Sequence, residues 1–262
     1  METVAVYFLH GLAYSGLLFL VSSGLTLVFG MMNVLNFAHA TFYMLGAYFS
    51  YSLLKITGNF WLSLLVCPLL LLALGAIIER FLLRRVHVFG HVHELLLTFG
   101  LAYILTELVK WIWGNYPLSL NIGSLQYANI NLMGITYPVY RIFIFACGVV
   151  VALAMMFVFY KTRIGITIRS AVDDPEMTNA LGVNVPFVFM GVFSMGAALS
   201  GFAGVIAGPL LTTYPGMAND ILLDAFVVIV VGGFGSLGGA VAASFIIGEL
   251  QSFGALLFPK LS

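Results

Sequence analysis

Apolar runs long enough to cross a lipid bilayer recur along this chain of 262 residues. Residues 60–78 and 139–160 form two such runs, and each has close to the roughly 20 residues that a membrane-spanning helix needs. Hydrophobic residues make up 62% of the chain and charged residues only 8%, so lipid rather than water must surround most of its surface. Because backbone groups in lipid must pair within their own segment, these runs are predicted to be helices. We therefore expect an all-α integral membrane protein.

The N-terminal stretch 4–54 is also apolar, but its length does not suit two simple spans. As a helix rising about 1.5 Å per residue, it would be more than twice as long as the roughly 30 Å hydrocarbon core. Asn33, Asn36 and His39 interrupt it beside Gly30, a pattern typical of a membrane helix that unwinds. The later expected spans are 60–78, 94–113, 139–160, 187–208, 221–231 and 240–257. The sequence thus predicts one membrane domain over residues 1–262, a polytopic bundle of about eight spans with one broken helix.

Two short connections carry most of the basic residues. They hold Arg80, Arg84 and Arg85, and Lys161, Arg163 and Arg169. Lys and Arg concentrate in the cytoplasmic loops of membrane proteins, so both connections are predicted to be cytoplasmic. Segment 114–138 between them has no basic residue and is predicted to lie on the opposite side.

The connection 161–186 reads KTRIGITIRSAVDDPEMTNALGVNVP and contains the signals of a short capped helix. Asp173 or Asp174 can cap the first amides, and Pro175 suits the first helical position. Gly182 is well placed to end the helix. The alternative is an ordinary solvated loop, because capped turns are common, and the local sequence does not decide between them.

The segment 232–239 reads GGFGSLGG and contains a literal GxGxxG at Gly233, Gly235 and Gly238. Because it follows the strand-like run 225–231, it resembles a dinucleotide-binding fingerprint. That fingerprint also requires an alternating βα unit and an acidic residue about 20 positions on. Here Glu249 comes only 11 residues after Gly238, and apolar helix surrounds the motif. Small residues also let membrane helices approach closely. We favour a turn or a close helix crossing, formed by Gly232, Gly233, Gly235, Gly238 and Gly239.

Polar residues elsewhere offer weaker candidates. His87, His91, His93 and Glu94 lie close together, but their spacing matches no closed metal site, so we assign no metal. The two cysteines lie inside apolar runs and are assigned no chemistry.

Acidic residues inside apolar segments need partners or water. Glu107 can pair with Lys110 one helical turn further on. Asp220 and Asp224 lie one turn apart and either face the bundle or form a proton relay. The polar residues that interrupt 4–54 are the better candidates for binding a small polar group, although they can also merely satisfy a helix break.

Three blocks give the chain a resemblance to a known family. They read GLTLVFGMMNVLNFAHATFYMLGAY at 24–48, RIGITIRSAVDDPEMTNALGVNV at 163–185 and GGFGSLGGAVAA at 232–243. With them the chain resembles the permease subunits of branched-chain amino acid ABC importers. That resemblance implies a helical core of inverted repeats in the inner membrane of a bacterium or archaeon. It further implies a second permease subunit, more often a paralogue than a copy, two cytoplasmic ATPase subunits and an extracytoplasmic solute-binding protein.

The resemblance also assigns roles to residues. The matching family segment is the coupling helix that sits in a groove of the ATPase, here Arg163, Gly165, Arg169, Asp173, Asp174, Pro175, Glu176, Leu181 and Gly182. The broken helix that faces the translocation path is matched by Asn33, Asn36, Phe37 and His39. No Walker A pattern occurs, so we expect no enzyme activity and no cofactor in this chain, with ATP and Mg²⁺ on the partner subunits.

Several alternatives stay open at this point. Related permeases also move urea, short amides and aromatic acids. A gradient-driven transporter would use Asp220 and Asp224, and an intramembrane serine protease would use Ser236 with a distant histidine. Relatives usually continue past the position of Leu261 with a further span, so the chain is either a shorter member or truncated.

Overall fold

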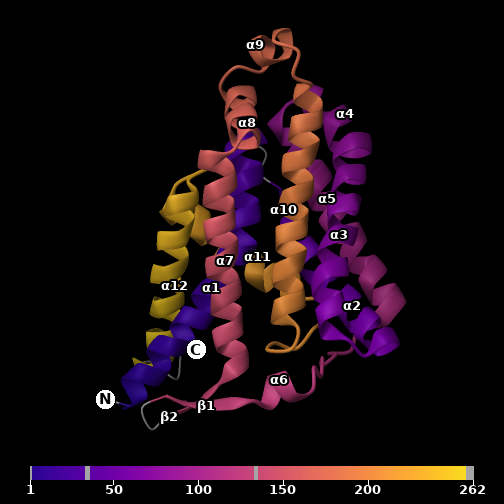
Figure 1. Ribbon diagram of the computed structural model, residues 1–262. Coiled ribbons are helices and arrows are strands. Elements are labelled where there is room, and N and C mark those ends of the chain that lie inside the picture. Colours follow the sequence, from indigo (N-terminus) through magenta and orange to yellow (C-terminus); the bar gives the residue numbers. More distant parts are fainter. Residues whose placement is uncertain (1, 33–35, 133–134, 258–262) are drawn as a thin grey trace.

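The computed structural model describes residues 2–32, 36–132 and 135–257. Long helices lie side by side in one bundle, which has two distinct ends (Figure 1). At the end that we call the α8–α9 end lie the short helices α8 (Arg163–Asp173) and α9 (Pro175–Ala180). The opposite hairpin end carries the strands β1 (Asn129–Leu132) and β2 (Ile135–Pro138). The expectation of a polytopic helical membrane protein is confirmed.

The N-terminal stretch forms two helices separated by a break, as its length predicts. Helix α1 (Glu2–Met32) runs from the hairpin end to the α8–α9 end, and α2 (His39–Thr57) returns. The His39 ring lies 3.0 Å from the carbonyl oxygen of Val21, 11 residues before the end of α1. At about 1.5 Å per residue, α2 therefore begins roughly 16 Å below the end of α1, inside the bundle.

The next helices form a hairpin that spans the bundle twice. Their bounds are α3 (Phe60–Ile78), the π-helical turn η1 (Glu79–Leu83), α4 (Arg84–Val86), the 3₁₀ turn η2 (His87–Phe89) and α5 (His91–Trp113). Asn59 begins α3, because its side-chain oxygen accepts a hydrogen bond of 2.9 Å from the Trp61 amide. Gly90, with a φ of 94°, makes the turn into α5.

Segment 114–138 contains structure that the sequence analysis did not predict. After the single turn α6 (Ser124–Tyr127), β1 and β2 pair in antiparallel register, with Ile130 opposite Tyr137. The strands have four residues each, too few for an alternating pattern to stand out in an asparagine-rich connection. The all-α expectation therefore holds for the bundle, with a small hairpin outside it.

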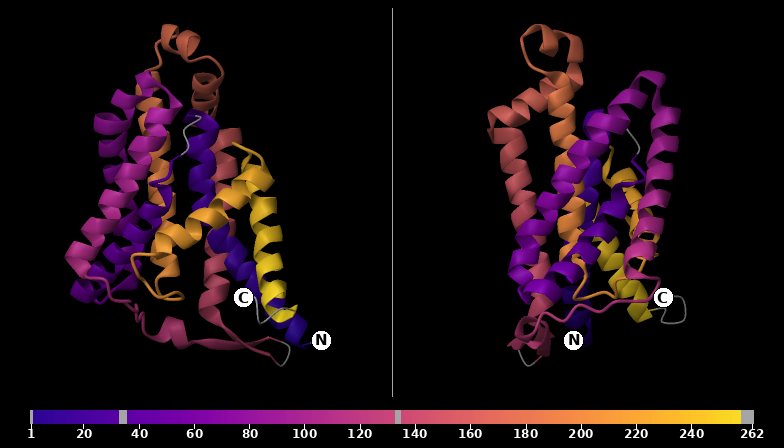
Figure 2. Two further views of the ribbon diagram at one scale, coloured as in Figure 1. Left: turned by 180° about the vertical axis from the view of Figure 1, so that it is seen from behind. Right: turned by 90° about the vertical axis from the view of Figure 1, so that its right-hand side faces the viewer.

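The second half of the chain adds four long helices around α1. Their bounds are α7 (Val139–Lys161), α10 (Val185–Ala207), α11 (Met217–Gly232) and α12 (Leu237–Leu257). Helix α1 packs against α7, α10, α11 and α12, whereas α10 packs against α1, α2 and α3. Figure 2 shows α11 crossing the bundle obliquely before α12 returns to the hairpin end.

Among the described residues, six helices are long and apolar enough to cross a bilayer. They are Thr3–Met32, Phe60–Phe89, His91–Trp113, Val139–Lys161, Val185–Ala207 and Leu237–Leu257. The other two expected spans correspond to α2 and α11. Helix α2 is rich in polar residues, and α11 has only 16 residues, two of them aspartates.

Glycines let the central helices touch backbone to backbone. A Cβ on Gly24 of α1 would lie 2.6 Å from the Gly196 carbonyl oxygen of α10, and a Cβ on Gly196 would lie 3.0 Å from the Gly24 carbonyl oxygen. A Cβ on Gly46 of α2 would lie only 2.1 Å from the Gly201 carbonyl oxygen. Such approaches are typical of membrane helices, whose association depends on close van der Waals packing.

Candidate functional site

The two basic connections lie at the same end of the bundle. Arg84 and Arg85 of α4 and Arg163 of α8 are at the α8–α9 end, whereas segment 114–138 lies at the hairpin end (Figure 1). The chain therefore separates a basic end from an end with few basic residues.

Residues 161–186 form two helices where the sequence analysis expected one. Thr162 begins α8, because its hydroxyl oxygen accepts a hydrogen bond from the Gly165 amide. Gly165 itself packs on the last turn of α7, where an added Cβ would lie 2.2 Å from the Phe159 carbonyl oxygen. Thr162 and Gly165 are the signals that could have revealed α8.

The capping prediction for α9 is confirmed, with Asp174 rather than Asp173 as the cap. The Asp174 carboxylate accepts a hydrogen bond of 2.9 Å from the Met177 amide, and Pro175 occupies the first helical turn. The helix ends at Ala180, one residue before Leu181, and Gly182 has a φ of 88°. Glu176 is exposed, and Leu181 is 78% exposed. Helix α9 is thus a rigid, solvent-facing protrusion.

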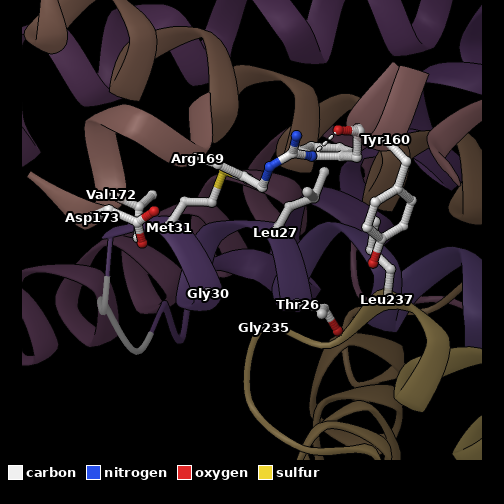
Figure 3. A pocket seen from close by; sticks show the side chains of 11 residues that line it. Thr26, Leu27, Gly30, Met31, Tyr160, Arg169, Val172, Asp173, Gly235 and Leu237 are labelled. Atoms are coloured by element: carbon white, nitrogen blue, oxygen red, sulfur yellow. Dashed lines mark hydrogen bonds between the residues drawn. The ribbon is translucent and has the colours of Figure 1, made fainter. Parts of the chain in front are cut away.

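Arg169 joins α8 to the rest of the bundle. Its guanidinium donates a hydrogen bond to the Phe159 carbonyl oxygen at the end of α7 and lies 5.9 Å from the centre of the Tyr160 ring. Figure 3 shows Arg169 and Asp173 on one side of a cavity of about 170 Å³, with Gly30 of α1 and Gly235 on the other. Helix α8 therefore adjoins the last turn of α1, just before the helix break.

The residues of the break do not gather at one surface. His39 is fully buried, with its ring 3.0 Å from the Val21 carbonyl oxygen and its own carbonyl oxygen bonded to the Ser200 hydroxyl. Asn36 is also buried, and its side-chain oxygen accepts a hydrogen bond of 3.0 Å from the Ala38 amide. Asn33 lies outside the described residues. Asn36 and His39 thus hold the break in place within the bundle.

Phe37 points the other way, into a groove of about 290 Å³ between α2, α5 and α11. Its ring packs against Phe99 of α5 and Phe226 of α11. The polar residues that line the groove are Thr41, Tyr103, Thr106, Glu107, Lys110 and Asn219. These positions come from three separate helices, so their spacing in the sequence does not connect them to the break.

The groove contains an ion pair that the spacing predicts. The Lys110 ammonium lies 2.7 Å from the Glu107 carboxylate, one helical turn away on α5. This pair gives the wall charges of both signs, and Thr41 and Asn219 add neutral polar groups beside the aromatic surface of Phe37.

The glycine-rich segment 232–239 is a tight turn between α11 and α12. Gly233 and Gly235 have φ values of 87° and 77°, and a Cβ on Gly239 would lie 1.7 Å from the Gly232 carbonyl oxygen. Because α11 is a helix and not a strand, the dinucleotide fingerprint is excluded. The segment forms a turn, one of the two structures that its small residues predict, and an added Cβ on Gly238 would meet no atom within 4 Å.

The histidine cluster is organised around a buried carboxylate. Glu94 binds the His87 ring through one oxygen and the His91 ring, at 3.2 Å, through the other. Within the described part of the chain, no three His, Cys, Asp or Glu side chains are placed to hold a metal ion. Beside this cluster, Arg84 donates two hydrogen bonds to the buried Glu79, the shorter at 2.8 Å, and a third to the Pro186 carbonyl oxygen.

The two aspartates of α11 both have partners. Asp224 accepts a hydrogen bond of 2.6 Å from the Tyr14 hydroxyl of α1 and one of 3.3 Å from Gln251 of α12. Asp220 accepts one from the Tyr214 hydroxyl, and this hydrogen bond raises the pKa of Tyr214. These contacts join α11 to its neighbours, a structural role for both carboxylates.

The Ser236 hydroxyl accepts a hydrogen bond of 3.0 Å from the Gly239 amide within the glycine-rich turn. This contact gives Ser236 a local structural role at the start of α12.

Comparison with known proteins gives a consistent picture. The family model described as branched-chain amino acid transport system, permease component, matches residues 7–261. The chain is 27% identical to the high-affinity branched-chain amino acid transport system permease protein BraD of Pseudomonas aeruginosa, over 95% of this chain and 85% of that protein. It is 26% identical to the corresponding protein LivH of Escherichia coli, over 96% and 87%.

A similar relative occurs in an archaeon. The probable branched-chain amino acid transport permease protein LivH of Methanocaldococcus jannaschii is 26% identical, over 91% of this chain and 77% of that protein. No solved structure matches the chain. The family match covers nearly the whole sequence, including the break, the α8–α9 segment and the glycine-rich turn. The chain therefore belongs to the family of permease components of branched-chain amino acid transport systems, as a multi-pass membrane protein and not itself an ATPase.

Proposed function

We propose that this chain is the membrane-spanning subunit of an ATP-driven importer that carries branched-chain or other small amino acids across the inner membrane. The permease family and the names of the relatives support this proposal. ATP and Mg²⁺ bind to two separate cytoplasmic ATPase subunits. A second permease subunit, a paralogue of this chain, completes the membrane part, and an extracytoplasmic protein delivers the solute.

The proposed topology has eight spans, because α2 and α11 join the six apolar helices in crossing the membrane. The α8–α9 end faces the cytoplasm, which is supported by the basic residues of α4 and α8. The polar residues of α2 and the shortness of α11, with its two aspartates, are typical of discontinuous transporter helices, which line the path of the substrate.

An inverted repeat relates α1–α2–α3 to α10–α11–α12 in this proposal. Helices α1 and α10 run in opposite directions, and each is followed by an irregular segment and a short helix. The packing is reciprocal: α1 contacts α12 where α10 contacts α3, and α1 contacts α11 where α10 contacts α2. Each of Gly24 and Gly196 lies against the carbonyl oxygen of the other, and this reciprocal contact supports a pseudo-twofold axis where α1 crosses α10.

Coupling to ATP hydrolysis is assigned to α8 and α9. The main observation that supports this role is that α9 is capped and exposed at the basic end of the bundle. The ATPase would contact Asp173, Asp174, Glu176 and Leu181, while Gly165 and Arg169 transmit its motion to α7. Because the α8 cavity also borders Gly30 and Gly235, motion of α9 reaches the end of α1 and the helix break beside it.

The translocation path is assigned to the groove between α2, α5 and α11. It extends from Phe37 at the break to Lys110 near the hairpin end, the side from which the solute would arrive. Phe37 would contact the apolar side chain of the substrate. The Glu107–Lys110 pair would interact with its ammonium and carboxylate groups.

The test is co-purification of the tagged chain with its ATPase subunits, together with transport in proteoliposomes. The double variant Asp174→Asn, Glu176→Lys changes the charge of α9, while the asparagine oxygen still caps the helix. We expect the variant to lose the ATPase or the ATP-dependent uptake of leucine. Lys55→Glu, an exposed change at the hairpin end, is the matched control.

Three results would contradict parts of this proposal. If the ATPase remains bound and coupled to uptake in the α9 variant, α9 does not couple ATP hydrolysis to transport. Uptake by the chain alone, driven by an ion gradient, would exclude an ATP-driven importer. If urea, short amides or aromatic acids inhibit leucine uptake competitively, those compounds belong to the substrates of the importer.

A further inference from the structure

A second large hollow lies at the α8–α9 end, away from the proposed translocation path. It has a volume of about 500 Å³ and is enclosed by α7, α8 and α10, with Leu27 of α1 at its base. Phe159, Ile168 and Val192 form its walls.

The hollow has the character of a surface in contact with lipid. Helix α10 contains no charged residue, and α7 contains none between Arg141 and Lys161. At the edge of the hollow, Phe187 is 65% exposed and Ile164 is 63% exposed. These side chains continue the apolar outer surface of α7, so the hollow opens toward the hydrocarbon core.

The rim of the hollow at the α8–α9 end is basic. Arg163 and Thr167 of α8 are the polar side chains that line it, and Lys161, two residues before Arg163, is exposed. The Arg163 guanidinium has no hydrogen bond or ion pair with any residue in the described ranges. No carboxylate is among the described residues that line the hollow. Its charge therefore complements an anion at the membrane surface.

The shape of the hollow suits a lipid chain rather than a helix of another protein. Along α10 it extends from Phe187 to Met195, about 12 Å at 1.5 Å per residue. Gly191 lines it on the α10 side, where an added Cβ would meet no atom within 4 Å. A transmembrane helix would need a contact along most of the bilayer, whereas the first part of an acyl chain enters to this depth.

We propose that the hollow binds one anionic phospholipid of the leaflet on the α8–α9 side, with an acyl chain against Gly191 and the headgroup phosphate on Arg163. Basic pockets between membrane helices commonly bind such headgroups. The bound lipid fills the space between α7, α8 and α10 and so holds α8 against the bundle. The proposal does not depend on the transported substrate.

The experiment measures lipid binding to the chain purified together with its partner subunits. The complex is placed in nanodiscs of phosphatidylcholine that contain a photoactivatable phosphatidylglycerol, and the labelled peptides are mapped. Label is expected on 158–168 and 187–195. Photoactivatable phosphatidylcholine, which carries no net charge, serves as the comparison.

Two pairs of variants separate the acyl chain from the headgroup. Arg163→Gln should reduce phosphatidylglycerol labelling about fivefold and Arg163→Lys should largely retain it, with Arg85→Gln as the matched control. Gly191→Leu fills the hollow and should remove the label, whereas Gly100→Leu, at another open glycine on α5, should not. Equal labelling in all variants would overturn the proposal. So would the absence of label from the assembled complex when the free chain is labelled, because a partner subunit would then occupy the hollow.

Discussion

The backbones of Gly30 and Gly235 lie in direct contact: a Cβ on Gly30 would be 2.4 Å from the Gly235 Cα atom, and a Cβ on Gly235 would be 2.8 Å from the Gly30 Cα atom. This contact joins the last turn of α1 to the turn between α11 and α12. It thereby connects the helix break in the first half of the chain to the glycine-rich segment in the second.

Gly235→Ala should destabilise the folded protein. An alanine at a φ of 77° is strained by about 1–3 kcal/mol, and its Cβ would also press on Gly30. Gly238→Ala, three residues away in open space, is the control and should leave the melting temperature in detergent almost unchanged. Equal melting temperatures for the two variants would show that the Gly30 contact does not constrain the turn.

Gly46→Ala should impair the packing of α2 on α10. The new Cβ would lie 2.1 Å from the Gly201 carbonyl oxygen, so the helices must separate, at a cost of about 1–3 kcal/mol. Gly100→Ala on α5 has open space around it and serves as the control. The measurement is the yield of monodisperse protein together with its thermal unfolding. A Gly46→Ala variant as stable as Gly100→Ala would contradict the close crossing.

Trp113→Phe should weaken the contact between α5 and α2. The Trp113 indole donates a hydrogen bond of 2.7 Å to the Ser52 hydroxyl, and its ring packs on Tyr48 and Phe49. Loss of the hydrogen bond costs about 1 kcal/mol. In a double-mutant cycle with Ser52→Ala, we expect the two effects to be non-additive. Strict additivity would mean that the two side chains do not interact.

Arg169→Gln should uncouple the proposed importer. The variant loses the charged hydrogen bond to the Phe159 carbonyl oxygen, about 1.5–3 kcal/mol, which holds α8 on the end of α7. We expect ATPase activity of the assembled complex to persist while uptake per ATP falls. Arg85→Gln, a basic residue of α4 at the same end, provides the control. Unchanged uptake per ATP in Arg169→Gln would argue against transmission through this contact.

Local chemistry predicted several elements of this protein with good accuracy. The run 60–78 coincides with α3, and Asp174, Pro175 and Gly182 mark α9 to within a residue. These signals succeed because helix length in a bilayer and end capping depend on neighbouring residues only. The break after Met32 was predictable for the same reason, since excess length and polar residues coincide there.

The candidate site was less predictable because it is built from distant segments. Phe37, Glu107 and Asn219 meet in one groove only after α2, α5 and α11 have packed. His39, a candidate binding residue in the sequence, is fully buried, and one nitrogen of its ring contacts the Val21 carbonyl oxygen. Which face of a helix a polar residue occupies depends on tertiary packing, and a single sequence does not contain that information directly.

The central position of α1 has a consequence for biosynthesis. The start of α2 reaches α1 through His39, but the main neighbours of α1, namely α7, α10, α11 and α12, all follow residue 138. More than half of the chain must therefore leave the ribosome before the first helix acquires them. Until then, side chains that the folded bundle buries, such as those of Ser22 and Ser23, lack these neighbours. A nascent chain that stops before α7 cannot assemble this core, and the earliest segment to enter the membrane is therefore among the last to reach its native surroundings.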